Sequence, residues 1–307
     1  MTKDFLAVSD LSLYEFNRLL ELGAEVKAKP RRFKRALEDK ILAMIFEKPS
    51  LRTRMTFEVG MLQLGGEAVY LGPSDIQMGK RESPSDIGRN LERWVDGIMI
   101  RTFAHEIAVE LAAAVRIPVI NALTDLLHPC QAMADFLTLK EKRGGLASLK
   151  LAYVGDGNNV CRSLINAAAK SGTRMAVAAP KGYEPSADVV ERAREAGRET
   201  GFAVDIVRDP EEAVSGADAV YTDVWASMGQ ESEKQKRARV FARYRVTAGL
   251  MAKASPGALF MHCLPAHRGD EVTSEVIDSP ASVVFDQAEN RLHIQKAIML
   301  ILMGKKI

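Results

Sequence analysis

The residues best suited to chemistry form a short polar run at positions 50–54, with the sequence Ser-Leu-Arg-Thr-Arg. An apolar stretch at residues 41–46 precedes the run and is predicted to be a buried strand, and residues 55–64 are predicted to form a helix. Free N–H groups at a helix start bind anions, and arginine side chains present forked donors that match phosphate oxygens. The run therefore predicts a phosphate cradle, although a capped turn with solvated arginines would show the same residue types.

Further polar side chains follow two other predicted strands. Arg101 closes the apolar strand at residues 97–101, where a ligand in the crevice or solvent would be within its reach. His128 and Gln131 are three residues apart, just before a predicted helix at residues 132–142, so they can face one ligand. Histidine can hydrogen-bond a carbonyl oxygen, and glutamine can hold an amide-like NH2. Helix capping and a Cys/His metal site are the alternatives, but no usual metal-ligand spacing is present.

Two loops in the second half of the chain are suited to binding an amino acid. The turn at residues 155–159 resembles a dinucleotide-binding turn, but Val160 stands where that motif needs a small residue. Its asparagines suit a carboxylate or amide ligand better. Asp223 is placed to bind an ammonium group, and Ser227 with the following backbone is placed to bind a carboxylate. Together they predict a grip on a zwitterion, with an ordinary loop and a capping aspartate as the alternative.

The segment at residues 262–269 begins His-Cys-Leu-Pro and follows a predicted strand. A Cys-His pair is compatible with a thiol nucleophile, but a covalent step needs a third, orienting group that the sequence does not identify. The alternative to a thiol nucleophile is a binding role, in which the carbonyls of Cys263 and Leu264, which precede Pro265, accept hydrogen bonds from a ligand amide.

These residues depend on alternating apolar strands and helices, which predict an α/β fold with parallel sheets covered by helices on both faces. We expect two domains. The first, at residues 1–140, is joined by a returning C-terminal helix at residues 286–307, and the second spans residues 141–285. Ligands bind beyond the carboxyl ends of strands in such sheets, and each polar group above lies at such a position. The predicted strands are residues 41–46, 68–71, 97–101, 118–122, 150–154, 175–179, 203–207, 219–222 and 258–262.

The composition is that of an ordinary globular protein. The chain has 307 residues, 47% of them hydrophobic, and a formal net charge of +2, which favours neither nucleic acid nor a membrane surface as a partner. We see no secretory signal and no apolar run long enough to span a bilayer. Three scattered cysteines predict neither a disulfide framework nor a zinc site, so we expect a reducing cytoplasm.

Taken together, these segments resemble the carbamoyltransferase family over almost the whole chain and in the same order. The motifs that carry the resemblance are residues 50–54, Arg101, residues 128–131, residues 223–229 and residues 262–265. Residues 227–229 and Cys263 are similar to the ornithine branch of that family. The resemblance implies transfer of a carbamoyl group from carbamoyl phosphate to L-ornithine for arginine synthesis. It also implies no metal and no organic cofactor, and a homotrimer with sites at the subunit interfaces.

The resemblance also implies roles for individual residues. Arg101, His128 and Cys263 are the expected catalytic residues. The set expected to bind carbamoyl phosphate is Ser50, Leu51, Arg52, Thr53, Gln77 from a neighbouring subunit, Arg101, His128, Gln131, Cys263, Leu264 and Arg291. The set expected to bind ornithine is Asn159, Asp223, Ser227 and Met228. Carbamoyl phosphate is expected to bind first.

One position departs from the family pattern. Leu51 stands where a threonine is usual, and the change matters only if that hydroxyl, and not the backbone N–H, binds phosphate. The sequence does not identify the general base, for which Cys263 and the leaving phosphate are the candidates. It also does not determine the direction of the reaction in the cell. The alternatives are a transferase for an acylated ornithine or putrescine, a non-catalytic sensor of the same fold, and a dinucleotide oxidoreductase.

Overall fold

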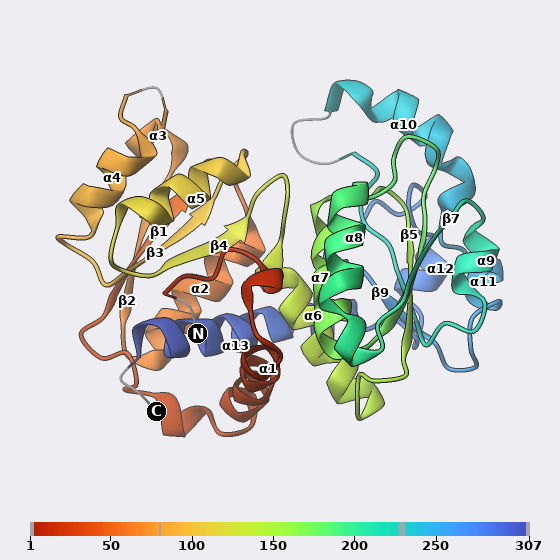
Figure 1. The fold of residues 1–307 in the computed structure, drawn as a ribbon, viewed down its shortest axis with the longest axis horizontal. Helices are drawn as coiled ribbons and strands as arrows, with labels where there is room; N and C mark the ends of the chain where they lie inside the picture. The colour runs from red at the N-terminus through yellow and green to blue at the C-terminus, as the bar shows by residue number, and fades with distance from the viewer. Residues whose placement is uncertain (1–2, 80, 227–230, 305–307) are drawn as a thin grey trace. The chain divides into compact units, whose positions relative to one another are not determined.

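The computed structural model describes residues 3–79, 81–226 and 231–304, which form two compact units (Figure 1). Unit 1 comprises Met1–Leu137 and Glu289–Ile307, and unit 2 comprises Thr138–Ala288. Each unit is built on a parallel sheet with helices, and the C-terminal helix packs on the first sheet. The predicted fold class is therefore confirmed.

Unit 1 contains a four-stranded sheet in the order β2-β1-β3-β4, in which all neighbours are parallel. Its strands are β1 (Ile41–Phe46), β2 (Glu67–Leu71), β3 (Gly97–Arg101) and β4 (Val119–Leu123). Its helices are η1 (Val8–Asp10), α1 (Leu13–Ala28), η2 (Pro30–Phe33), α2 (Leu51–Leu64), α3 (Pro73–Ile76), α4 (Pro84–Leu91) and α5 (His105–Ala114). Two helices, α6 (Pro129–Arg143) and α13 (Val284–Met303), each contribute residues to both units.

The central strands of unit 1 are buried on both faces, as their unbroken apolar sequences require. In Figure 1, α4 and α5 cover one face of this sheet, and α2 and α13 lie on the other. The close approach of α13 depends on Gly97, because a Cβ at that position would lie 2.9 Å from the Sδ atom of Met303. The C-terminal helix is thus part of the core that holds β3 in place.

Unit 2 contains a five-stranded parallel sheet in the order β7-β6-β5-β8-β9. Its strands are β5 (Lys150–Val154), β6 (Arg174–Ala178), β7 (Val204–Val207), β8 (Ala219–Tyr221) and β9 (Leu259–Met261). Its helices are α7 (Asn159–Ser171), α8 (Ala187–Ala196), η3 (Arg198–Thr200), α9 (Pro210–Val214), η4 (Glu231–Glu233), α10 (Lys234–Phe241), η5 (Ala242–Tyr244), α11 (Ala248–Met251) and α12 (Ser274–Ile277).

The sheet of unit 2 is also covered on both faces. Helices α7 and α8 lie on one side of it, and α9, α11 and α12 lie on the other (Figure 1). On the second side, Val154, Val220 and Phe260 from three strands share a buried apolar cluster with Val214 of α9 and Val276 of α12. Polar groups that follow β5, β8 and β9 therefore rest on a packed support.

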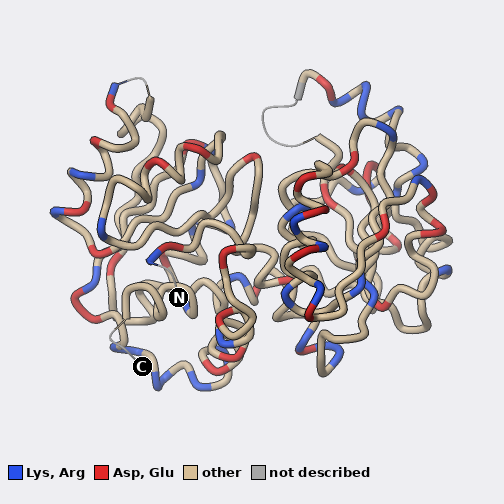
Figure 2. The backbone as a smooth tube through the Cα atoms, in the orientation of Figure 1, with Lys and Arg blue, Asp and Glu red and all other residues tan. Residues whose placement is uncertain are grey.

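Basic and acidic residues are interspersed along the backbone of each unit, as Figure 2 shows, in keeping with the net charge of +2. Within residues 3–79, 81–226 and 231–304, none of the helices is both long enough and apolar enough to cross a membrane.

Candidate active site

The polar run of unit 1 forms the first turn of a helix. Helix α2 begins at Leu51, so the predicted start at residue 55 is wrong. Ser50 explains the earlier start, because it caps the helix and its Oγ accepts a hydrogen bond of 3.2 Å from the N–H of Thr53. Arg52 is half-buried and Thr53 is fully buried, so the basic and hydroxyl groups of the run lie where the helix dipole favours an anion.

A buried arginine of the last helix joins two of the predicted site segments. Arg291 donates from Nη1 to Oε1 of Gln131 at 2.7 Å and from Nη2 to Oγ1 of Thr53 at 3.1 Å. With its amide turned to match its neighbours, Gln295 accepts from Nη2 and Nε of Arg291 at 3.0 and 3.2 Å. Residues from α2, α6 and α13 thus share one guanidinium, which is only 3% exposed. The structure brings Thr53, Gln131 and Arg291 together, as a shared ligand would require.

His128 lies immediately before α6 and is buried among positive charges. Burial, and then the charges of Arg291, Arg101 and Arg52, lower the pKa of His128 well below its ordinary value of 6.5. The imidazole is therefore neutral at neutral pH and can donate a hydrogen bond to a carbonyl oxygen without carrying a charge. Arg101, at the end of β3, is itself only 7% exposed. Three guanidiniums around a neutral donor suit a ligand with a phosphate and a carbonyl.

The amide of Gln131 is oriented by its neighbours. Its Nε2 donates to Oδ1 of Asp135 at 2.8 Å, and its Oε1 receives the bond from Arg291. An amide oxygen has two lone pairs, so Oε1 can also accept a hydrogen bond from a ligand NH2. The predicted role of Gln131 is compatible with this orientation.

The leucine that departs from the family pattern points its side chain outward. Leu51 is 74% exposed, whereas Thr53 two positions later is 1% exposed. The backbone N–H of Leu51 occupies the first position of α2, where the helix itself supplies no acceptor. A phosphate bound there would meet the backbone of residue 51, whichever side chain the residue carries.

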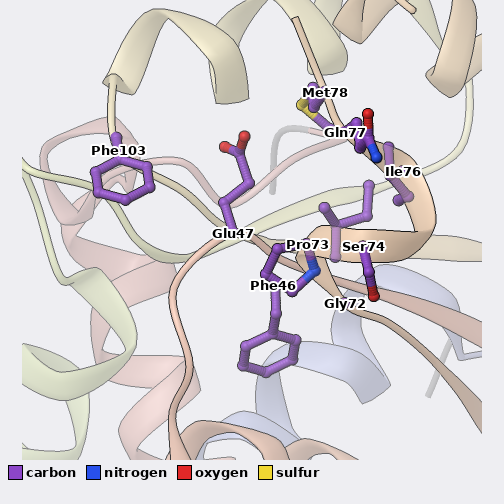
Figure 3. A pocket seen from close by; sticks show the side chains of 10 residues that line it. Phe46, Glu47, Gly72, Pro73, Ser74, Ile76, Gln77, Met78 and Phe103 are labelled. Atoms are coloured by element: carbon purple, nitrogen blue, oxygen red, sulfur yellow. The ribbon is translucent and has the colours of Figure 1, made fainter. Parts of the chain in front are cut away.

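Gln77 lies in another part of unit 1, in the segment that follows α3. It is exposed and has a left-handed backbone, with φ of 50°. It lines a cavity of about 600 Å³ that Figure 3 shows with Glu47 and Phe103 on the opposite side. The hydroxyl of Thr102 donates to the carboxylate of Glu47. The expectation that Gln77 serves a neighbouring subunit remains a prediction.

Unit 2 brings three polar residues together at the ends of adjacent strands. Asp223 follows β8 and accepts hydrogen bonds from Nδ2 of Asn158 at 2.7 Å and from Sγ of Cys263 at 3.1 Å. Asn158 lies beyond β5 and Cys263 beyond β9, and these are the two sheet neighbours of β8. Asp223 is only 5% exposed, so its carboxylate is a fixed acceptor suited to an ammonium group.

The sequence interpretation selected Asn159, but its neighbour makes the contact to Asp223. Asn158 caps α7, with Oδ1 accepting from the N–H groups of Val160 and Cys161 at 3.0 and 3.1 Å, and its Nδ2 remains for Asp223. Asn159 is half-buried and is the first residue of α7. The preference for asparagine at helix caps was the signal that could have identified Asn158.

The turn after β9 is held by a histidine. Leu264 has φ of 59°, and its N–H donates to Nδ1 of His262 at 2.9 Å. Since Nδ1 accepts, the proton is on Nε2, which lies 3.1 Å from Oε1 of Glu271. Possible ligand atoms of Asp223, His262 and Cys263 lie within 4.8 Å of one another. Both nitrogens of His262 already have partners, so this set is poorly suited to a metal ion.

The predicted ornithine residues Ser227 and Met228 lie outside the described residues. Arg237 of α10, which the sequence interpretation did not select, bonds to groups in two of the site loops. Its Nη1 donates to Oδ2 of Asp156 at 2.8 Å and to the carbonyl of Trp225 at 2.9 Å. Nothing in the sequence around position 237 distinguishes this arginine from the other basic residues of its helix.

Two family models together match most of the chain, and both describe the same family. The family model described as "Aspartate/ornithine carbamoyltransferase, carbamoyl-P binding domain" matches residues 3–141, and the "Asp/Orn binding domain" model matches residues 147–302. An ornithine carbamoyltransferase of Anoxybacillus flavithermus is 54% identical over 303 residues, covering 98% of this chain and 96% of the relative.

Solved structures agree with these matches. The ornithine carbamoyltransferase of Pyrococcus furiosus is 48% identical with a TM-score of 0.96, covering 99% of this chain and 98% of that one. The anabolic ornithine carbamoyltransferase of Campylobacter jejuni is 37% identical with a TM-score of 0.92, covering 97% and 98%. The resemblance stated from the motifs is therefore confirmed over nearly the full chain.

Proposed function

Because the chain belongs to the aspartate/ornithine carbamoyltransferase family, we propose that it transfers the carbamoyl group of carbamoyl phosphate to the δ-amine of L-ornithine. The products are L-citrulline and phosphate, and the pathway is arginine biosynthesis. The observation that carries this proposal is the buried contact of Arg291 with Gln131 and Thr53, beside the neutral His128.

Unit 1 takes carbamoyl phosphate. Arg52, Arg101 and Arg291 supply the charge for its phosphate, and the capped start of α2 supplies backbone donors. Thr53, Arg101 and His128 polarise the carbonyl, and Gln131 holds the carbamoyl NH2 with the carbonyls of Cys263 and Leu264. These roles follow the family resemblance, and the positions of the unit 1 groups are compatible with them.

Unit 2 takes ornithine. The buried carboxylate of Asp223, fixed by Asn158 and Cys263, suits the α-ammonium group. An acylated ornithine has no charge at that nitrogen and would leave the carboxylate without its ion pair. Putrescine lacks the carboxylate that Asn159, Ser227 and Met228 are proposed to bind. Ornithine therefore satisfies more of the proposed groups than either alternative does.

The residues of unit 1 fit the charge changes of the reaction. When the neutral δ-amine attacks the carbonyl carbon, negative charge grows on the carbonyl oxygen and on the leaving phosphate. Donors already fixed at those atoms lower the barrier, and losing one such donor costs about 2.7–4 kcal/mol in comparable oxyanion sites. The base that takes the amine proton is open, with Cys263 and the leaving phosphate as the candidates.

The proposal extends to assembly and compartment. We propose a homotrimer in which Gln77 contributes to a neighbouring subunit's site, and a cytoplasmic location. Sedimentation of the purified protein tests whether it is a trimer. If Gln77 serves a neighbouring subunit's site, a Gln77→Ala variant should sediment like the wild type but have lower transfer activity.

The first experiment measures transfer by purified protein from carbamoyl phosphate to ornithine, with N-acetylornithine, putrescine and aspartate as parallel acceptors. Turnover with ornithine alone is the expected result. Turnover with another amine would keep the phosphate site but reject the proposed role of Asp223. If no acceptor is used while carbamoyl phosphate still binds, the chain is a sensor of the same fold.

A further inference from the structure

A buried carboxylate contacts both ends of the turn that follows β9. Oε1 of Glu271 accepts hydrogen bonds from Nε2 of His262 at 3.1 Å and from the backbone N–H of His267 at 2.6 Å. Between these two anchors lie Cys263, Leu264, Pro265 and Ala266. We call residues 262–267 the carbonyl turn, because it carries the two carbonyls proposed to hold the carbamoyl NH2.

We propose that His262 and Glu271 are positioning residues that hold the carbonyl turn in the orientation needed for carbamoyl transfer. This proposal rests on the proposed function, and it concerns two residues that do not themselves contact a substrate. The imidazole of His262 binds the N–H of Leu264 within the turn. Glu271 holds that imidazole and also binds the N–H of His267 at the other end of the turn.

The conformation of Leu264 shows why the turn needs a fixed partner. A φ of 59° places Leu264 in the left-handed region, which is unfavourable for a residue with a branched side chain. The hydrogen bond from its N–H to Nδ1 of His262 holds the backbone there. A peptide group is rigid, so fixing the N–H of Leu264 also fixes the direction of the Cys263 carbonyl on the same peptide plane.

Both positioning residues are held firmly by the rest of unit 2. His262 and Glu271 are each 0% exposed. The backbone N–H of His262 donates to Oε1 of Gln287 at 3.0 Å, and the backbone carbonyl of Glu271 accepts from Val246 at 2.9 Å. Burial raises the pKa of Glu271, but the hydrogen bonds from His262 and His267 outweigh it and leave this pKa below its ordinary value. Glu271 is thus an ionised acceptor in a rigid place.

A purely structural role for the pair would predict a different outcome on substitution. Variants would then lose stability, and the activity of the fraction that remains folded would be unchanged. A positioning role predicts slower turnover by fully folded protein. The two roles separate when activity is measured per folded molecule.

Two substitutions of His262 divide its two hydrogen bonds. In His262→Asn, the amide oxygen lies near the position of Nδ1 and can still accept from Leu264. In His262→Gln, the amide nitrogen lies near Nε2 and can still donate to Glu271, but the acceptor for Leu264 is lost. We expect kcat to fall about 100-fold in His262→Gln, in line with the effect of small misplacements in active sites, and about tenfold or less in His262→Asn.

Matched controls keep the interpretation specific. Arg268 lies just beyond the carbonyl turn, and its exposed guanidinium pairs with Asp278 at 2.7 Å, so Arg268→Lys should retain the wild-type kcat. Glu271→Gln keeps an oxygen acceptor of the same shape and should be far more active than Glu271→Ala. The inhibition constant of inorganic phosphate reports on the proposed phosphate site of unit 1. We expect it to change by no more than about twofold in any variant, which is less than the effect of losing one hydrogen bond.

The proposal is overturned if His262→Asn and His262→Gln lose activity equally, or if losses vanish when rates are divided by the folded fraction. Equal losses in His262→Gln and Arg268→Lys would overturn it as well. Wild-type turnover tests the proposed function separately. If the wild type prefers another amine, the same variant ratios are measured with that amine, because the carbamoyl group is unchanged. A wild type that transfers to no amine rejects both proposals.

Discussion

Arg291 donates a hydrogen bond of 2.7 Å to Gln131, although 160 positions of sequence separate the two residues. The same guanidinium reaches Thr53, which is 238 positions away. The three residues belong to the last helix, to α6 and to the first turn of α2. The proposed anion site of unit 1 is therefore assembled from three segments that are far apart in the sequence.

This contact predicts the effect of Arg291→Lys. A lysine keeps the charge but loses the planar fork, so it cannot serve Gln131 and Thr53 together. We expect the KM for carbamoyl phosphate to rise about 10- to 100-fold, the range for one charge-assisted hydrogen bond, with little change in the KM for ornithine. Initial-rate kinetics measure both constants. The exposed Arg192, paired with Asp188 in α8, offers the control Arg192→Lys, and equal effects in both variants would contradict the prediction.

The outward direction of Leu51 predicts that its departure from the family pattern has little effect. We expect Leu51→Thr to change the affinity for carbamoyl phosphate by about tenfold or less, or roughly 1.4 kcal/mol. The reason is that residue 51 offers its backbone N–H at the helix start while its side chain is 74% exposed. Carbamoyl phosphate titrations of initial rate provide the measurement. A larger change would mean that a hydroxyl at this position contacts the phosphate.

The pKa of His128 predicts how stability depends on pH. This pKa is well below 6.5 in the folded protein, so the unfolded chain binds the proton first as pH falls. Above pH 6.5, His128 is neutral in both the folded and the unfolded chain, and its contribution to the free energy of unfolding is complete. As the pH drops towards the folded-state pKa, the free energy of unfolding falls by up to about 1.4 kcal/mol per pH unit. Urea unfolding between pH 5 and 8 should therefore show a smaller loss at low pH for His128→Gln than for the wild type. Identical pH dependence in the two proteins would contradict this.

The ion pair of Arg237 with Asp156 predicts a second pH effect with the opposite sign. Burial raises the pKa of Asp156 above 3.8 even though Arg237 lowers it, so removing Arg237 raises this pKa further. Arg237→Gln should cost about 3 kcal/mol of stability at pH 8, because the carboxylate then lacks its buried partner. The deficit should shrink as pH falls through the raised pKa and Asp156 becomes protonated. Thermal unfolding at pH 5 and pH 8 measures it, and a constant deficit would show that charge is not its cause.

The fold was predictable because its signals are local. The apolar stretches at residues 41–46, 97–101 and 150–154 match β1, β3 and β5 without error. The start of α2 was misplaced, because Arg52 and Arg54 in a first helical turn oppose the dipole and were interpreted as part of a turn. In the structure Arg54 pairs with Glu58 and lies over the ring of Tyr70, and the second of these contacts comes from a strand that the local pattern does not reveal.

Residues of the proposed site could be selected from the sequence where their types repeat a known pattern, but the residues that support them from distant parts of the chain could not. Asp223 and Cys263 could be selected from their motifs, and the structure brings them together. Arg237 and Glu271 act through buried bonds to other loops, and no local spacing marks them. Such supporting residues are identified by their contacts, which a single sequence does not reveal.

The division of unit 1 into two stretches has a consequence for synthesis. Domains commonly fold as units, the N-terminal one first, while the ribosome adds residues. Here Thr138–Ala288 forms a continuous unit, whereas the first unit waits for Glu289–Ile307. The nascent chain therefore carries β3 without Met303 beside Gly97, and Thr53 without Arg291, until its final segment leaves the exit tunnel. The proposed phosphate site begins with residues that are synthesised early and is completed by residues that are synthesised last. A polypeptide that terminates before residue 289 therefore contains all of the second unit but lacks the Arg291 that contacts Thr53.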